Sequence, residues 1–376
     1  MLNDKLLELK NLPIFWMSLS SKELFHSNFI SWILETYPKE MGLFFCKILK
    51  LEPIFEIREL KREKLNIDIS FYLGNTIVLI ENKVKSIAYE KQLTDYNELY
   101  KDKTKEIILL SLKEPTIDLK NWKYLNYKDL VEQLEYLVSN KDIDIYHKYL
   151  INDYIKFMKI LLNELLPFVN IKKVEISTLY KKDTEANKLL EQLTEIRMHD
   201  FFLKGLFEDA AKFLREKLEI EKNIKVTSKN ISECNKEDNA FSVTFGMSRA
   251  QGLLDIKYKI EKDVIIGIQI QGLQYRQFIE GKDKDYIEKI SKQFLENKKW
   301  FLFFNRLEKH KDLKIYPEER KSLETNKEES KFNKFSSSQG LFLYRSVKID
   351  SFTNQVLFDM ISQDIDTILE IKKDFI

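Results

Sequence analysis

The sequence has few of the residues that build disulfide frameworks or zinc sites. Its 376 residues include two cysteines, Cys46 and Cys234, and four histidines that are scattered along the chain. So few cysteines, so far apart, exclude a disulfide framework and a cysteine-based zinc site. No apolar run approaches the ~20 residues that a membrane-spanning helix needs. The N-terminal stretch MLNDKLLELKNLPIF contains acidic residues and no apolar core of signal-peptide length, so we expect a cytoplasmic protein without a membrane partner.

The chain also lacks a strong net charge. Its 62 basic residues face 60 acidic residues, which leaves a net charge of +2. This balance argues against a purely electrostatic nucleic-acid binder, but not against an enzyme with a local basic groove. The 44% hydrophobic and 32% charged residues are typical of a soluble globular protein, and the length allows two domains.

The first part of the chain predicts an α/β domain over residues 1–166. The helix and strand assignments follow from apolar periodicity, and Gly74-Asn75 is a turn signal between two strands. The predicted elements are a helix at 21–35, strands at 66–73 and 76–84, a helix at 86–100, strands at 106–112 and 122–127, and helices at 127–138 and 143–166.

A connector is predicted at 167–186, and a second α/β domain over 187–376. The predicted elements of the second domain are a helix at 187–219, strands at 240–246, 252–260 and 264–271, a helix at 284–297, a strand at 300–304, a mobile loop at 306–339, a strand at 341–348 and a helix at 354–373. Because the order helix, strands, helix, strand, helix occurs twice, the predicted fold class is α/β, with a mixed sheet flanked by helices.

Acidic residues and a lysine occupy the first predicted strand pair. Glu81 and Lys83 are two residues apart and therefore share one face of a strand, and Asp68 lies on the polar face of the neighbouring strand. Glu81 ends the apolar run IVLIE, where a buried charge is costly unless a cation compensates it. Carboxylates and the backbone carbonyl of Asn82 are ligands that Mg²⁺ prefers, and Lys83 could offset phosphate charge. The same spacing also fits a simple ion pair between Glu81 and Lys83.

Together these motifs resemble the PD-(D/E)XK nuclease superfamily, in which an acid lies on one strand and (D/E)XK on the next. Asp68 stands in N-I-D-I, without a preceding proline, and I-E-N-K ends at Lys83. The segment E-L-F-H-S, which begins at Glu23, is similar to the E-x-x-H-S helix of one bacterial branch. Q-L-T-D-Y, from Gln92 to Tyr96, is like the Q-x-x-x-Y element of exonuclease-like members. The resemblance covers roughly residues 20 to 130, and only the combination is specific.

The resemblance implies a restriction-endonuclease-like first domain that depends on Mg²⁺ or Mn²⁺. Asp68, Glu81 and Asn82 would hold the metal ion, and Lys83 would orient water or stabilise the developing charge. The bacterial branch implies DNA cleavage, for example in the restriction of foreign DNA, so DNA is favoured over RNA as the substrate.

Four further residues have a functional and a structural interpretation. Glu23 and His26 share a helix face with Ser27. Glu23 would be an extra metal ligand or a water-positioning acid, and His26 would lie near the phosphate; otherwise Glu23 is a helix-terminal charge and His26 a packed polar residue. Gln92 would contact phosphate or metal-bound water, and Tyr96 would pack or contact substrate; otherwise both lie on an ordinary helix face.

The second domain repeats the layout with different chemistry. An aspartate and two glutamines occupy the places of the acid and of the E-x-K element: Asp255, Gln269 and Gln271. Neutral amides are poor Mg²⁺ ligands, so a duplicated second site would be degenerate and inactive. Arg276 beside Tyr275 could contact nucleic acid; the alternative is a purely structural domain.

We therefore expect a two-domain metal-dependent nuclease whose partner is nucleic acid. A homodimer and an activating protein partner are further candidates for its assembly. The alternative of a different class is a catalytically silent nucleic-acid-binding or scaffold protein with a nuclease-like fold. An intermediate alternative is a nuclease that stays silent until a partner or ligand engages the C-terminal domain.

Overall fold

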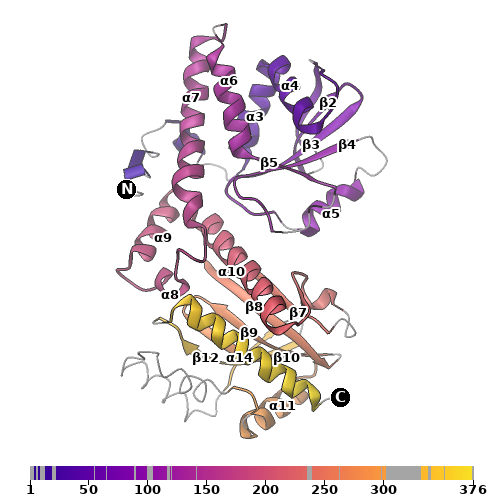
Figure 1. Cartoon of the computed structure of the whole chain (residues 1–376), viewed down its shortest axis with the longest axis vertical. Coiled ribbons are helices and arrows are strands. Elements are labelled where there is room, and N and C mark those ends of the chain that lie inside the picture. Colours follow the sequence, from indigo (N-terminus) through magenta and orange to yellow (C-terminus); the bar gives the residue numbers. More distant parts are fainter. Residues whose placement is uncertain are drawn as a thin grey trace. The chain divides into compact units, whose positions relative to one another are not determined.

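The chain folds into two compact units of mixed α/β structure in a computed structural model (Figure 1). The first unit comprises Met1–Val169 and Glu191–Gly205, and the second comprises Asn170–Leu190 and Leu206–Ile376. The chain therefore enters the second unit twice, an arrangement that the predicted division into 1–166, 167–186 and 187–376 does not contain. The structure describes residues 4–5, 7–8, 13–18, 23–54, 56–64, 66–88, 90–99, 105–116, 119, 121–140, 142–234, 239–261, 263–297, 299–301, 332–337, 340–350 and 352–374.

The first unit is built on a mixed sheet of order β1-β2-β3-β4-β5. Strand β2 pairs antiparallel with both β1 and β3, whereas β4 pairs parallel with both β3 and β5. The strands are β1 (Ile57–Lys64), β2 (Ile67–Leu73), β3 (Thr76–Lys83), β4 (Lys105–Ser111) and β5 (Lys123–Asn126). The predicted turn between β2 and β3 is confirmed, and Gly74 adopts a φ of 58° there, which suits glycine.

Helices pack on both faces of this sheet. They are α2 (Pro13–Ser18), α3 (Leu24–Thr36), α4 (Pro38–Leu49), α5 (Glu90–Leu99), α6 (Tyr127–Ser139) and α7 (Ile145–Ile160). Leu79 of β3 belongs to the same buried cluster as Leu93 of α5. Phe71 of β2 contacts Phe45 of α4 edge-on, with ring centroids 5.4 Å apart. Because side chains alternate along a strand, successive residues of β3 face opposite sides of the sheet.

The second unit contains a mixed sheet of order β11-β12-β10-β9-β8-β7-β6, in which only β6 and β7 are parallel. Its strands are β6 (Val226–Thr227), β7 (Phe241–Ser248), β8 (Gln251–Glu261), β9 (Val264–Gln271), β10 (Gln274–Gly281), β11 (Asn333–Ser337) and β12 (Gly340–Lys348). The remaining α-helices of the described residues are α8 (Ile176–Leu179), α9 (Glu185–Glu195), α10 (His199–Lys222), α11 (Lys284–Glu296) and α14 (Asn354–Lys373). Helices α10 and α14 lie side by side over one face of the sheet (Figure 1), where the Phe213 and Phe358 rings are 5.1 Å apart.

The predicted fold class, mixed sheets flanked by helices, is confirmed, but several elements differ. The helix expected at 187–219 is interrupted after α9, because Arg197 adopts a left-handed φ of 56°. Part of the loop expected at 306–339 is strand β11, which pairs with β12; residues 302–331 lie outside the described residues. Trp300 and Phe301 are not in a strand, and the rest of the strand expected at 300–304 lies outside the described residues.

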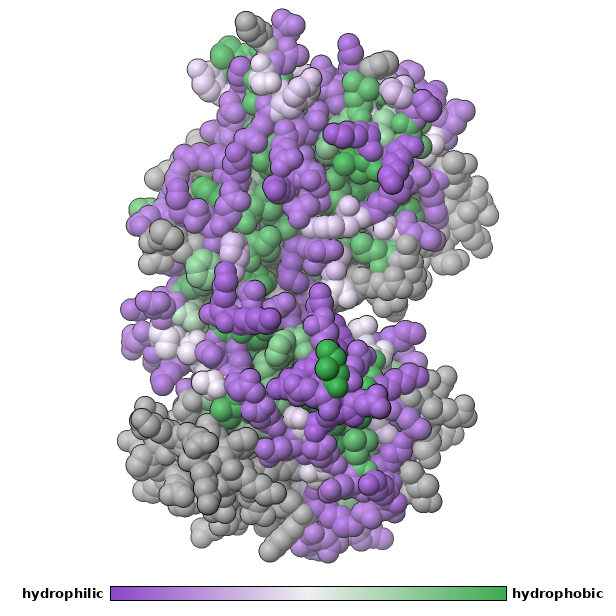
Figure 2. Space-filling model, viewed as in Figure 1, coloured by the Kyte–Doolittle hydropathy of each residue, from purple (hydrophilic) through white to green (hydrophobic). Residues whose placement is uncertain are grey.

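The face of the molecule that Figure 2 shows is predominantly hydrophilic. Hydrophilic residues cover most of the face shown in Figure 2, and apolar residues appear as smaller groups between them. Within the described part of the chain, no helix combines the length and the apolar character needed to cross a bilayer.

Candidate active site

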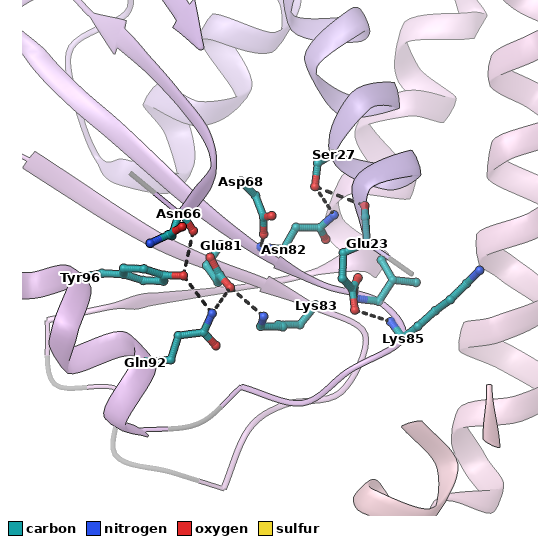
Figure 3. Close-up of polar contacts among 11 residues, drawn as sticks. Glu23, Ser27, Asn66, Asp68, Glu81, Asn82, Lys83, Lys85, Gln92 and Tyr96 are labelled. Atoms are coloured by element: carbon teal, nitrogen blue, oxygen red, sulfur yellow. Dashed lines mark hydrogen bonds and ion pairs between the residues drawn. The ribbon is translucent and has the colours of Figure 1, made fainter. Parts of the chain in front are cut away.

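Strands β2 and β3 separate at the site. Their pairing extends to Ile69 and Ile80 and ends there, although both strands continue. Beyond this point a side chain replaces the strand backbone as a hydrogen-bond partner: Asp68 Oδ2 accepts a 2.7 Å bond from the backbone N–H of Asn82. The divergence of the two strands thus places a carboxylate against the segment that contains Glu81 and Lys83 (Figure 3).

Glu81 carries the most unusual carboxylate of the site. It is only 2% exposed, because it directly follows a run of buried apolar residues in β3. Its Oε1 is 2.7 Å from Lys83 Nζ and accepts a 2.8 Å hydrogen bond from Gln92 Nε2. Its Oε2 is buried and has no hydrogen-bond partner among the described residues. One oxygen is therefore held in place, and the other is available to a ligand.

Glu23 lies next to the end of β3, but its carboxylate contacts the backbone. Oε2 accepts a 2.7 Å hydrogen bond from the N–H of Val84, and Oε1 accepts a 3.0 Å bond from the N–H of Lys85 (Figure 3). Both residues follow the last residue of β3. The structure thus brings Glu23 to the site, where it holds the strand end, and its role as an extra metal ligand or a water-positioning acid stays a prediction.

The buried carboxylates perturb each other. Burial, and then the charge of Glu81, raise the pKa of Asp68 from 3.8 to about 7. Burial also raises the pKa of Glu81, although Lys83 opposes this effect. Burial alone would lower the pKa of Lys83, but its contact with Glu81 outweighs this and raises it. Lys83 therefore compensates the acidic charge only in part, and a bound cation would stabilise the ionised form of Asp68.

Gln92 and Tyr96 of α5 support Glu81 from the side. Gln92 Nε2 donates to Glu81 and also to the Tyr96 hydroxyl, at 2.9 Å. The Tyr96 hydroxyl in turn donates to the backbone carbonyl of Asn66, at 2.8 Å, in the turn before β2 (Figure 3). The predicted helix face is therefore directed at the acids. Its polar atoms orient Glu81 in this structure, and the predicted contacts with phosphate or substrate stay predictions.

His26 does not lie where a substrate could reach it. The side chain is fully buried, and its ring packs among aromatic rings that include those of Tyr127 and Phe157. Its Nδ1 is 3.0 Å from the hydroxyl of Tyr154. The expected phosphate contact is thus corrected to a packed polar position, because α3 directs His26 into the core.

The donor set fits a hard divalent ion. Asp68 and Glu81 offer carboxylate oxygens, one of which is buried and has no hydrogen-bond partner in the part of the chain that the structure describes, and the adjoining Asn82 offers a backbone carbonyl. Among the described residues, no three His, Cys, Asp or Glu side chains form a group that could hold a metal ion by themselves. Mg²⁺ is commonly bound through one or two carboxylates with several retained waters, which matches a pair of acids.

The second unit places its predicted site residues in a hydrogen-bonded network. Asp255 is directly opposite Gln269 in the β8–β9 register, and Gln269 Nε2 donates to it at 2.8 Å. Arg276 Nη1 donates to Gln269 Oε1 and Gln271 Oε1, at 2.6 Å each. The guanidinium also lies 4.7 Å from the centre of the Tyr344 ring. Arg276 thus lies with the glutamines, and its substrate contact stays a prediction.

The expected partnership of Arg276 with Tyr275 is wrong. Tyr275 is fully buried, and its hydroxyl donates to Asp364 of α14 at 2.7 Å. Neighbouring residues of a strand point to opposite faces, so the two side chains of β10 cannot form one clamp.

Sequence reasoning missed two residues near the acids. Tyr127 is buried behind β3 and directly follows β5. The end of β5 lies beside the end of the parallel strand β4, and this position in the sequence was the available signal that Tyr127 lies near the site. Lys85 is 2% exposed and donates to the backbone carbonyl of Ser18 at 3.1 Å. Burial lowers the pKa of Lys85 to about 8. Its spacing of two from Lys83 was the available signal.

Comparison with known proteins assigns no family. No protein-family model, curated protein or solved structure matches the chain. Function must therefore be inferred from the geometry of the site and from the motifs that its residues form.

Proposed function

We propose that the first unit is a metal-dependent nuclease that hydrolyses phosphodiester bonds of nucleic acid, with DNA favoured over RNA. The observation that carries the proposal is Glu81, a buried carboxylate with one oxygen held by Lys83 and Gln92 and the other without a partner among the described residues. Such a carboxylate, next to Asp68 with its raised pKa, is costly for folding and is typical of functional sites.

Each residue of the site has a role in this proposal. Asp68, Glu81 and the Asn82 carbonyl would hold Mg²⁺ or Mn²⁺, which polarises phosphate and lowers the pKa of bound water. Lys83, with its raised pKa, remains protonated and can orient water or offset the charge that develops on the phosphate. Gln92 keeps the Glu81 carboxylate oriented.

Two features of the fold support a restriction-endonuclease-like first unit and a degenerate second copy. Helix α3, the antiparallel strands β2 and β3 with their acids, and helix α5 follow in the order that the motif resemblance implies. Extending the β2–β3 register by one residue sets Asp68 opposite Glu81, as Asp255 is opposite Gln269. The next strand differs, because β4 is parallel to β3 whereas β10 is antiparallel to β9.

Defence against foreign DNA in the bacterial cytoplasm is the role that we propose.

The test is cleavage by the full-length protein. Plasmid, linear duplex, single-stranded DNA and RNA are each incubated with Mg²⁺, Mn²⁺ or chelator. We expect metal-dependent cleavage that Asp68→Ala and Glu81→Ala abolish without unfolding the protein. Asp255→Ala, at the corresponding position of the second unit, is the matched control and should cleave normally. Binding without cleavage, or cleavage that survives Glu81→Ala, would contradict the proposal.

A further inference from the structure

A second set of contacts lies behind the acids, on the opposite side of β3. Asn82 is fully buried, and its side chain faces away from those of Glu81 and Lys83 because residues alternate along the strand. Its Nδ2 donates to Ser27 Oγ at 3.1 Å, and its Oδ1 accepts from the Tyr127 hydroxyl at 2.5 Å. Asn82, which lies between Glu81 and Lys83, is therefore hydrogen-bonded through both polar atoms of its side-chain amide.

The contacts continue beyond Tyr127. The buried His26 ring lies near the Tyr127 ring, and its Nδ1 is 3.0 Å from the hydroxyl of Tyr154. Tyr127 gives its one hydroxyl proton to Asn82. Burial lowers the pKa of His26 well below its usual value, so the ring is neutral. Nε2 is the His26 ring atom that has no hydrogen-bond partner among the described residues.

At the other end, Ser27 donates to the backbone carbonyl of Glu23 at 3.3 Å. The result is a hydrogen-bonded network of three fully buried residues, Tyr127, Asn82 and Ser27, that ends at the backbone carbonyl of Glu23. A satisfied buried network of this kind holds its members in one arrangement. Tyr127 and Ser27 can therefore affect the positions of the acids only by moving Asn82.

We propose that Tyr127 is a positioning residue that fixes Asn82 and thereby the metal-binding end of β3. The inference rests on the proposed nuclease function, since it concerns how the ligands are held. Asn82 is flanked by Glu81 and Lys83, and its own N–H donates to Asp68, so a rotation of its peptide would displace every group of the site. Partners that orient metal ligands typically change metal affinity or activity by about 10- to 100-fold when removed.

The test measures Mn²⁺ binding to the metal-free full-length protein by calorimetry, without nucleic acid. Tyr127→Phe is compared with wild type and with Tyr124→Phe. Tyr124 of β5 is the matched control, because it is a half-buried tyrosine of the same unit whose hydroxyl accepts a 2.9 Å bond from Asn126, which is not one of the three residues of the network. We expect Tyr127→Phe to weaken Mn²⁺ binding by roughly tenfold, and to lower kcat without changing KM for the nucleic acid. Tyr124→Phe should change neither.

Ser27→Ala removes the other partner of Asn82 and decides the question if Tyr127→Phe does not fold. It should weaken Mn²⁺ binding in the same direction. Wild-type Mn²⁺ affinity in the folded variant, together with normal cleavage by the wild type, would overturn the positioning role and leave the nuclease proposal standing. A wild type that neither binds Mn²⁺ nor cleaves nucleic acid would overturn both.

Discussion

Replacement of Asp68 by asparagine should stabilise the metal-free protein above neutral pH while it abolishes cleavage. Asparagine has nearly the same shape and keeps an oxygen that can accept the 2.7 Å hydrogen bond from the N–H of Asn82. What it loses is the negative charge, which burial and Glu81 disfavour in the folded protein. A carboxylate that destabilises its own fold is expected where function, and not packing, requires the acid.

The size of the effect follows from the pKa of Asp68. The rise from 3.8 to about 7 corresponds to a ceiling of about 4 kcal/mol, at about 1.36 kcal/mol per unit. Because Glu81 shares the repulsion and a buried amide must also be desolvated, we expect a gain of about 2 kcal/mol. In the unfolded chain Asp68 ionises near 3.8, whereas in the folded protein it stays protonated to about 7. The destabilisation of the wild type is thus absent below the lower value, grows between the two and is complete above the higher one.

The assay is urea unfolding in chelator at about pH 4.5 and about pH 8.5, on either side of most of this range. The Asp68→Asn protein should unfold at higher urea than wild type at the higher pH, with little difference at the lower pH. Asp95→Asn, which removes an exposed carboxylate of α5, is the matched control. A variant that is less stable than wild type at the higher pH, or that differs equally at both, would refute the reasoning.

Three further predictions concern the remaining charged residues. Lys83→Ala should slow cleavage by at least roughly 100-fold, through loss of an electrostatic stabiliser, with Mn²⁺ affinity in calorimetry unchanged or raised; weaker binding would contradict its role. Arg276→Ala should lower the free energy of unfolding by about 2 kcal/mol in urea titrations, because the oxygens of Gln269 and Gln271 lose their donor. Asp255→Ala should leave the single-turnover cleavage rate unchanged, and its loss in a folded variant would show that the second unit is catalytic.

The central hairpin and strands β4 and β5 could be predicted from sequence, whereas strands β1 and β10 could not. Strand β2 alternates apolar and more polar residues, β3 contains a continuous apolar run, and the turn at Gly74 lies between them, which together is a strong local signal. Strand β1, with the sequence IRELKREK, is an edge strand whose charges conceal the alternation. Strand β10 carries Arg276 and Gln277, whose hydrogen-bond partners include Gln269 of β9 and Asp364 of α14, so its polar sequence did not indicate a buried strand.

The acids of the site were predictable, and the contacts that orient them were not. Asp68, Glu81 and Lys83 follow from strand alternation. That Gln92 donates to Glu81, and not to a ligand, depends on the approach of α5 to the sheet. Tyr127 lies 45 positions along the chain from Asn82, and no local pattern distinguishes it from a tyrosine that merely fills the core.

The first unit consists of two separate segments of the sequence, and this limits where the chain can be cut into fragments or recombined with another gene. A fragment that stops at Val169 lacks the segment Glu191–Gly205, whose Leu193, Phe201 and Phe202 are at most 1% exposed. Such a fragment would leave apolar surface of its own core uncovered and would tend to aggregate. A single recombination point could not transfer the whole first unit to another protein, so the two units should be inherited together as one gene.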